Sequence, residues 1–117
     1  MGYPVVHFEI GCRDNQKTRA FYCDLFGWTA EPGEMSTELT TGAGGGINGM
    51  LTTLGHEPHN YTNIYVSVDD IDAVAQKAES LGGTILIPRT EIPGGKGEFA
   101  WIADPEGTTI GLYRSPE

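Results

Sequence analysis

Two residues near the N-terminus have side chains that are well suited to chemistry. A strand predicted over residues 5–10 places His7 and Glu9 on the same face, because side chains alternate along a strand. An imidazole beside a carboxylate can bind a polar ligand, contribute to a metal site or act as a general base. The alternative interpretation is that His7 is only a hydrogen-bonded polar residue of the strand and does not contact a ligand. The other face of this strand is predicted to be core: Val6, Phe8 and Ile10.

A second set of candidates is aromatic and lies in the C-terminal half. A strand predicted over residues 61–68 places Asn63 and Tyr65 on one face. Trp101 and Tyr113 lie on two later strands, and Tyr113 shares a face with Gly111. If these faces line a pocket, it suits a planar or apolar small molecule with a few hydroxyl contacts. The alternative is that the aromatic residues only fill the core.

A hairpin over residues 99–114 is the strongest structural signal. Its turn is the sequence Asp104-Pro105-Glu106-Gly107, in which proline presets φ and glycine closes the turn. The flanking segments are β-branched and aromatic, as strands prefer. Both faces of the hairpin are apolar, so both are predicted to be buried.

Two amphipathic helices precede later strands. Asp14 is predicted to cap a helix over residues 15–26, which Gly27 ends. Asp69 and Asp70 precede the second helix, which Gly82-Gly83 ends. Its predicted apolar stripe comprises Ile71, Val74, Ala75, Ala78 and Leu81. A strand predicted over residues 84–87 ends at Pro88, and residues 31–41 are predicted to form a loop and a modest strand.

The second half of the chain repeats the first. At an offset of 56 residues, His7 aligns with Asn63, Asp14 with Asp70, and Gly27 with Gly83. Each half reads as strand, helix, then several strands. We therefore predict one domain over residues 1–117, with module one at about 3–55, a linker at about 55–61 and module two at about 61–114.

These features together resemble the vicinal oxygen chelate superfamily, which includes glyoxalase I, bleomycin-resistance proteins and extradiol dioxygenases. The resemblance rests on the repeat, His7, the hairpin sequence DPEG followed by TTIGLY, and the phrases FYCDLFGW and YVSVDDIDA. It is closest to short proteins related to lactoylglutathione lyase. It implies an α+β fold in which two βαβββ modules form a half-open curled sheet around a small-molecule site, and it implies a homodimer.

The resemblance also implies positions for four metal ligands, and most of them lack a suitable side chain. The first falls on His7, the second on Asn63 and the closing-strand glutamate on Gly111. The remaining ligand falls near Asn48 or Gly49, and Glu98 could add a carboxylate if its strand faces inward. Transition-metal sites need three or more N, O or S donors. We therefore predict no cofactor and disfavour orthodox glyoxalase I activity, with a divalent metal as the alternative.

The composition limits the partners. The 117 residues carry seven basic and sixteen acidic side chains, for a net charge of −9, which argues against nucleic acid and anionic membranes. No export signal or membrane-length apolar run is present, so we expect a cytoplasmic protein with Cys12 and Cys23 reduced. The glycine-rich residues 44–49 match a dinucleotide-binding fingerprint, but no clear hydrophobic strand precedes them and no helix follows them, so we interpret them as a loop. His56 and His59 are predicted to lie at the surface.

We expect the ligand to contact His7, Glu9, Asn63, Tyr65, Trp101 and Tyr113. The predicted function is binding of a small organic ligand, or metal-independent chemistry on it. The alternative is a metal-dependent lyase or dioxygenase that resembles lactoylglutathione lyase.

Overall fold

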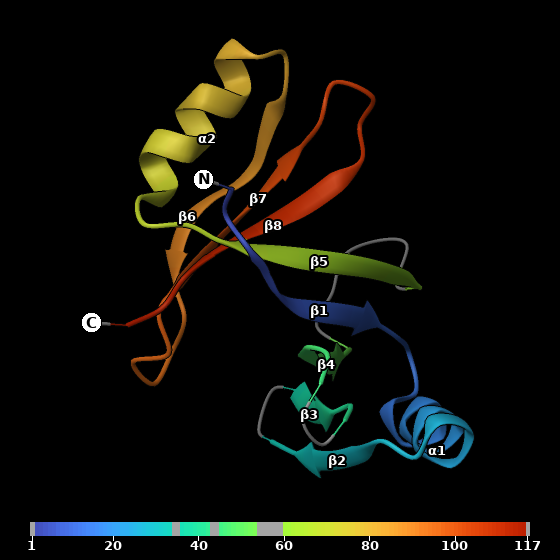
Figure 1. The fold of residues 1–117 in the computed structure, drawn as a ribbon. Helices are drawn as coiled ribbons and strands as arrows, with labels where there is room; N and C mark the ends of the chain where they lie inside the picture. Colours follow the sequence, from blue (N-terminus) through green and yellow to red (C-terminus); the bar gives the residue numbers. More distant parts are fainter. Residues whose placement is uncertain (1, 34–35, 43–44, 54–59, 117) are drawn as a thin grey trace. The chain divides into compact units, whose positions relative to one another are not determined.

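The computed structural model describes residues 2–33, 36–42, 45–53 and 60–116. The chain divides into two compact units, and both are drawn in Figure 1. The N-terminal unit comprises residues 7–63. The C-terminal unit comprises residues 64–117 together with the first six residues. The predicted linker at 55–61 falls largely outside the described residues.

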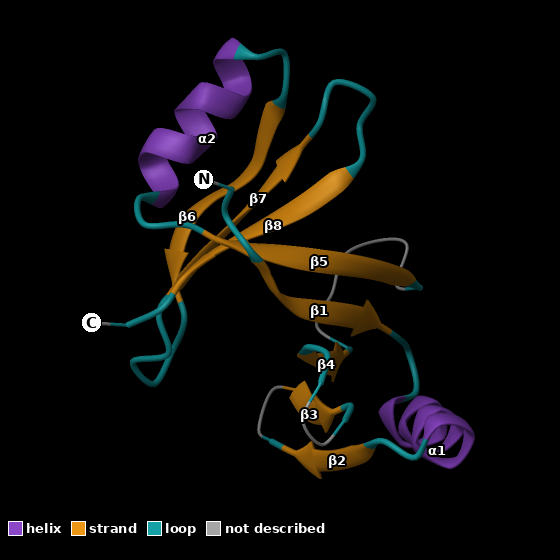
Figure 2. Cartoon of the chain, viewed as in Figure 1, coloured by secondary structure: helices purple, strands orange, loops and turns teal. Residues whose placement is uncertain are grey.

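The N-terminal unit contains one helix and a four-stranded part of the sheet in the order β2-β3-β4-β1. Strands β1 and β4 are parallel, whereas β2, β3 and β4 pair antiparallel. Figure 2 distinguishes the helix from the strands. The elements are β1 (Val5–Gly11), α1 (Asn15–Phe26), β2 (Thr29–Pro32), β3 (Ser36–Thr40) and β4 (Asn48–Thr52).

Helix α1 begins and ends at the predicted residues. The Asp14 side chain accepts a hydrogen bond from the Lys17 backbone N–H, and Gly27 adopts the left-handed conformation with φ +73°. The hydrophobic core of this unit is a cluster of three buried residues, Cys12, Leu39 and Leu51, against which partly buried hydrophobic residues pack. Those residues are Phe8, Ile10, Tyr22, Trp28 and Ala30.

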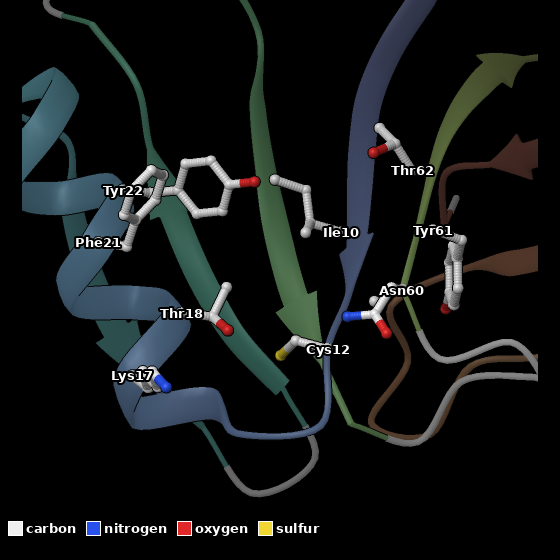
Figure 3. Close-up of a pocket in the computed structure, with 10 residues that line it drawn as sticks. Ile10, Cys12, Lys17, Thr18, Phe21, Tyr22, Asn60, Tyr61 and Thr62 are labelled. Carbon is white, nitrogen blue, oxygen red and sulfur yellow. The ribbon is translucent and has the colours of Figure 1, made fainter.

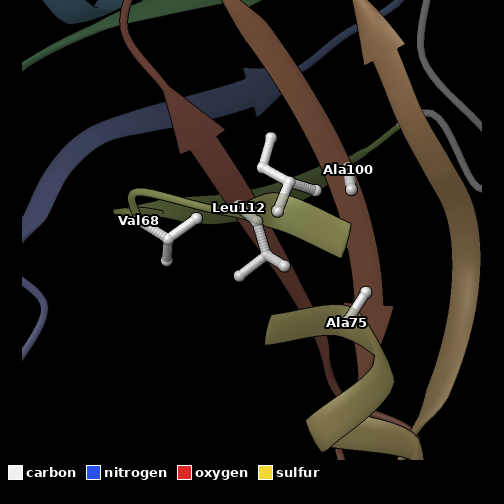
Figure 4. Close-up of a cluster of buried hydrophobic side chains, with 5 residues drawn as sticks. Val68, Ala75, Ala100 and Leu112 are labelled. Carbon is white, nitrogen blue, oxygen red and sulfur yellow. The ribbon is translucent and has the colours of Figure 1, made fainter. Parts of the chain in front are cut away.

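The C-terminal unit has the same order of elements, and its strands lie in the order β5-β8-β7-β6. Strand β5 is parallel to β8, and β6, β7 and β8 are antiparallel. The elements are β5 (Tyr61–Ser67), which starts in the N-terminal unit, α2 (Ile71–Ser80), β6 (Thr84–Glu91), β7 (Glu98–Ala103) and β8 (Thr109–Arg114). Helix α2 packs on one face of these strands (Figure 4), over a cluster of Val68, Ile71, Ala75, Ala100 and Leu112.

The predicted hairpin is β7, a turn and β8. The Asp104 side chain accepts hydrogen bonds from the backbone N–H groups of Glu106 and Thr108, and Gly107 has φ +93°. Both faces are buried as predicted, because Ala100 lies under α2 whereas Trp101 faces the other side.

Several local predictions were wrong. Strand β6 continues through Pro88, because it is an edge strand with register shifts around this residue, and there the missing N–H removes no ladder bond. Leu81 follows the last turn of α2 and is 69% exposed, so it is not part of the core stripe. Val6 is 37% exposed rather than core. Strands β2 (Thr29–Pro32) and β3 (Ser36–Thr40) pair with each other, so residues 31–32 belong to a strand, whereas a loop and one modest strand were predicted over residues 31–41.

The order of elements confirms an α+β fold made of two βαβββ modules. Neither helix within the described part of the chain is long and apolar enough to cross a membrane. Cys12 and Cys23 form no disulfide, and burial raises the pKa of the Cys12 thiol.

Candidate functional site

A buried carboxylate marks one face of the N-terminal unit. Glu9 is only 4% exposed, and its Oε2 accepts a short hydrogen bond from the Tyr61 hydroxyl. Burial raises the pKa of Tyr61, and the hydrogen bond to Glu9 adds to that effect. Tyr61 therefore stays a neutral donor at neutral pH. A buried carboxylate is costly unless it is hydrogen-bonded, so the pair fixes both side chains.

The same face continues across three strands in register. Glu9 of β1 lies opposite Met50 of β4, which in turn lies opposite Glu38 of β3. His7 shares this face by alternation and is half-buried. Burial lowers the pKa of His7, and the neighbouring Glu9 and Glu38 carboxylates oppose that effect in part. The imidazole is thus neutral at neutral pH, with two carboxylates near it.

Asn63 is the third polar residue of this region. It is 3% exposed, and neither its carbonyl oxygen nor its amide nitrogen has a hydrogen-bond partner in the protein. Strand β5 alternates so that Tyr61 and Asn63 lie on one side while Thr62 is exposed on the other. Since Tyr61 reaches Glu9, Asn63 belongs to the same face. We call the face of the N-terminal unit with His7, Glu9, Glu38, Tyr61 and Asn63 the polar face.

In the C-terminal unit, two of the residues that were predicted to contact the ligand form a hydrogen bond with each other. Tyr65 of β5 and Trp101 of β7 both lie opposite Gly111 of β8. The Trp101 Nε1–H donates to the Tyr65 hydroxyl across this glycine at 2.8 Å. Both side chains are nearly buried, at 6% and 7% exposure. The pair is a bridge over the strand, and we call it the Tyr65–Trp101 bridge.

Tyr113 is held at the edge of the same unit. Its hydroxyl donates to the Lys96 backbone carbonyl at 2.8 Å, and its ring is partly exposed. Tyr113 therefore anchors the loop before β7, which is a structural role that the sequence did not predict. The predicted ligand-binding set thus falls into two groups: His7, Glu9 and Asn63 in the N-terminal unit, and Tyr65, Trp101 and Tyr113 in the C-terminal unit.

The positions implied for metal ligands do not fit a metal. A side chain at Gly111 would overlap the Tyr65 ring, and one at Gly49 would overlap Phe8 on the face that packs against the core. Glu98 is not available either, because its carboxylate accepts hydrogen bonds from Arg89 at 2.8 Å and Arg114 at 3.2 Å. Within the described residues, no three His, Cys, Asp or Glu side chains are grouped so that they could hold an ion.

A groove of about 450 Å³ lies between α1 and the start of β5 (Figure 3). Tyr22 projects from α1 across it toward Ile10, and the Cys12 sulfur faces the helix side. Ile10 and Cys12, which alternate with Glu9 along the chain, line this groove. Tyr61 of the polar face lines it as well, so the groove and the polar face share that residue.

Sequence reasoning missed Tyr61 and Glu38. Period-two alternation from Asn63 and Tyr65 would have placed Tyr61 on the same face, one step earlier. The sequence carried no comparable signal for Glu38, because its place depends on the register of β3 with β4. His56 and His59, which were predicted to lie at the surface, are outside the described residues.

Comparison with known proteins agrees with this architecture. The family model of the glyoxalase/bleomycin resistance protein/dioxygenase superfamily matches residues 5–112, and the chain belongs to this superfamily. A protein of Mycobacterium tuberculosis (strain CDC 1551 / Oshkosh), provisionally named glyoxylase CFP32, is 30% identical over 92% of this chain. The anthracycline biosynthesis protein DnrV of Streptomyces peucetius is 27% identical over 92% of it. The chain spans 44% and 45% of the lengths of these two relatives.

Solved structures share the fold. Methylmalonyl-CoA epimerase from Mycobacterium tuberculosis superposes with a TM-score of 0.69 at 16% identity, covering 97% of this chain and 88% of that one. A superfamily member from Vibrio splendidus 12B01 gives 0.68 at 18% identity, covering 97% and 98%. At these identities the likeness establishes the fold alone.

Proposed function

We propose that this chain binds a small organic molecule on the polar face of its N-terminal unit, and that its action on that molecule needs no metal. The observation that carries the proposal is the Glu9–Tyr61 pair beside Asn63. Such buried polar groups reduce stability unless they are satisfied, so they are typical of functional sites.

The C-terminal unit supports the metal-independent part of the proposal. The closing-strand position at Gly111 has no side chain, and the Tyr65–Trp101 bridge covers it. Only His7 would then remain as a strong donor among the four implied positions, and one donor does not hold a divalent ion tightly.

Elemental analysis of the untagged protein, purified without chelators, tests this part directly. We expect well under one transition-metal ion per chain, before and after dialysis against Zn²⁺, Ni²⁺, Fe²⁺ or Mn²⁺. A content near one ion per chain that a His7→Gln variant loses would overturn the metal-independent proposal. The protein would then be assayed with lactoylglutathione and catechol substrates.

The ligand-binding part is tested with a panel of small molecules. Because DnrV is named for anthracycline biosynthesis, the panel includes planar polycyclic ketones as well as monocyclic lactams. We expect at least one compound to bind saturably and to shift backbone NMR signals of β1 and β5. Glu9→Gln should weaken that binding, whereas Glu106→Gln, in the exposed turn of the hairpin, should not.

A metal-dependent lyase or dioxygenase is the second candidate function. It is favoured by His7 and Glu9 lying on one strand face, and by the provisional glyoxylase name of a relative. The same elemental analysis separates the two candidates, because only this one requires a bound ion.

A further inference from the structure

We infer that Asn63 is the polar anchor for the ligand, and that it recognises a neutral group with a hydrogen-bond donor beside an acceptor, such as a lactam or primary carboxamide. This inference rests on the proposed small-molecule function and specifies the chemistry that the site would take.

Asn63 is a buried amide without a hydrogen-bond partner in the protein. The residue is 3% exposed, and both polar ends of its side chain lack a partner in the protein. Most buried side-chain polar atoms in native proteins are hydrogen-bonded, so an unpaired amide needs an explanation. An amide has one acceptor oxygen and two donor hydrogens on nitrogen. Its natural complement is a group that offers a donor and an acceptor at adjacent atoms.

The position of Asn63 on β5 determines which side its amide faces. On its own strand, Tyr61 is already engaged with Glu9, so the neighbouring hydroxyl is committed. The opposite side of β5 is exposed at Thr62 and Ile64, which confirms that Asn63 points to the polar face. The sequence repeat aligns Asn63 with His7, so corresponding strands of the two modules carry polar residues at the same position.

Charge selects among the groups that an amide can recognise. The polar face carries the Glu9 and Glu38 carboxylates, and the whole chain has a net charge of −9. An anionic carboxylate ligand would be repelled there. A neutral lactam or carboxamide matches both ends of Asn63 without that repulsion.

The test uses the full chain and 2-pyridone, a planar lactam whose N–H adjoins its carbonyl. N-Methyl-2-pyridone is the matched control probe, since it keeps the ring and the acceptor but lacks the donor. We expect 2-pyridone to shift the Asn63 side-chain amide signal saturably, and the N-methyl compound to bind at least about tenfold more weakly, which corresponds to the loss of one good hydrogen bond.

Two variants complete the experiment. Asn63→Leu, similar in size and apolar, should raise the melting temperature because it removes an unpaired buried amide, and it should abolish 2-pyridone binding. Asn60→Leu is the control, because Asn60 is an exposed asparagine just before the same strand, and it should leave 2-pyridone binding unchanged.

The outcomes distinguish this inference from the proposed function. A lower melting temperature for Asn63→Leu would overturn the inference, because it would mean that the amide is already satisfied, by protein or by ordered water. Equal 2-pyridone binding by wild type and Asn63→Leu would also overturn it, yet leave the small-molecule function standing. Failure of 2-pyridone, with binding of another panel compound at β1 and β5, would have the same meaning. If no compound binds there, the proposed function fails as well.

Discussion

His7 lies on the same strand face as Glu9, yet burial dominates the charge of its imidazole. The pKa of His7 is lowered from its ordinary value of 6.5 by burial, which outweighs the attraction of Glu9 and Glu38. The unfolded chain therefore binds a proton at a higher pH than the folded one. From this residue, stability is greatest above pH 6.5, falls as the pH drops below that value, and levels off below the folded pKa.

We accordingly expect the His7 ring signal to titrate below pH 6.5 in NMR spectra of the folded protein. The chain has three histidines, so the signal that disappears in a His7→Gln variant identifies the residue. That variant should also lose part of the decline in melting temperature between neutral and mildly acidic pH. A His7 pKa above 6.5 would show that the carboxylates, rather than burial, control the site.

The strand face on which a single residue lies could be predicted where the alternation of side chains along the strand alone determines it. Alternation placed His7 with Glu9 correctly, and the repeat directed attention to Asn63. The mutual bond of Tyr65 and Trp101 was not predictable, because it depends on both strands meeting Gly111 in register. The unpaired state of the Asn63 amide was not predictable either, because burial and the absence of a hydrogen-bond partner are properties of the folded chain.

At the scale of the element, the closing hairpin depends on the absence of a side chain at Gly111. A Cβ there would overlap the Tyr65 ring, so Gly111→Ala must displace that ring or separate β5 from β8. We expect a loss of about 1–3 kcal/mol in the free energy of unfolding, as for other overpacked cores. Urea denaturation measures it. Gly45→Ala, which adds a Cβ with no atom within 4 Å, is the matched control and should change little.

A Tyr65→Ala background checks the cause. Removing the ring should relieve the overlap, so that Gly111→Ala costs much less there than in the wild type. An equal cost in both backgrounds would mean that Gly111 is required for its backbone rather than for the Tyr65–Trp101 bridge.

Helices and the hairpin turn were predictable because their ends are determined by local chemistry. Asp14, Gly27 and Asp104 act through residues only a few positions away. The strands β2 and β3 were harder, because their polar sequence gives little periodic signal and their pairing supplies the order. Pro88 was misleading, since its effect depends on whether the strand lies at an edge.

At the scale of the molecule, the acidic surplus opposes the folded state. Sixteen acidic and seven basic residues give a charge of −9, and Glu31 lies directly opposite Glu38 across β2 and β3. Like charges in that position are destabilising, and self-repulsion favours expansion. Added salt shortens the range of both effects, from a Debye length of about 30 Å at 0.01 M to about 10 Å at 0.1 M.

The melting temperature should therefore rise by a few degrees when NaCl is increased from about 0.01 M to about 0.1 M, and calorimetry measures it. Glu31→Gln should raise the value at low salt and reduce its dependence on salt, because it removes one of two facing charges on exposed strand positions. Asp24→Asn, at a largely exposed position of α1, changes the net charge equally without relieving that pair. Equal effects of the two variants would assign the salt response to net charge alone, and a melting temperature that does not depend on salt would contradict both explanations.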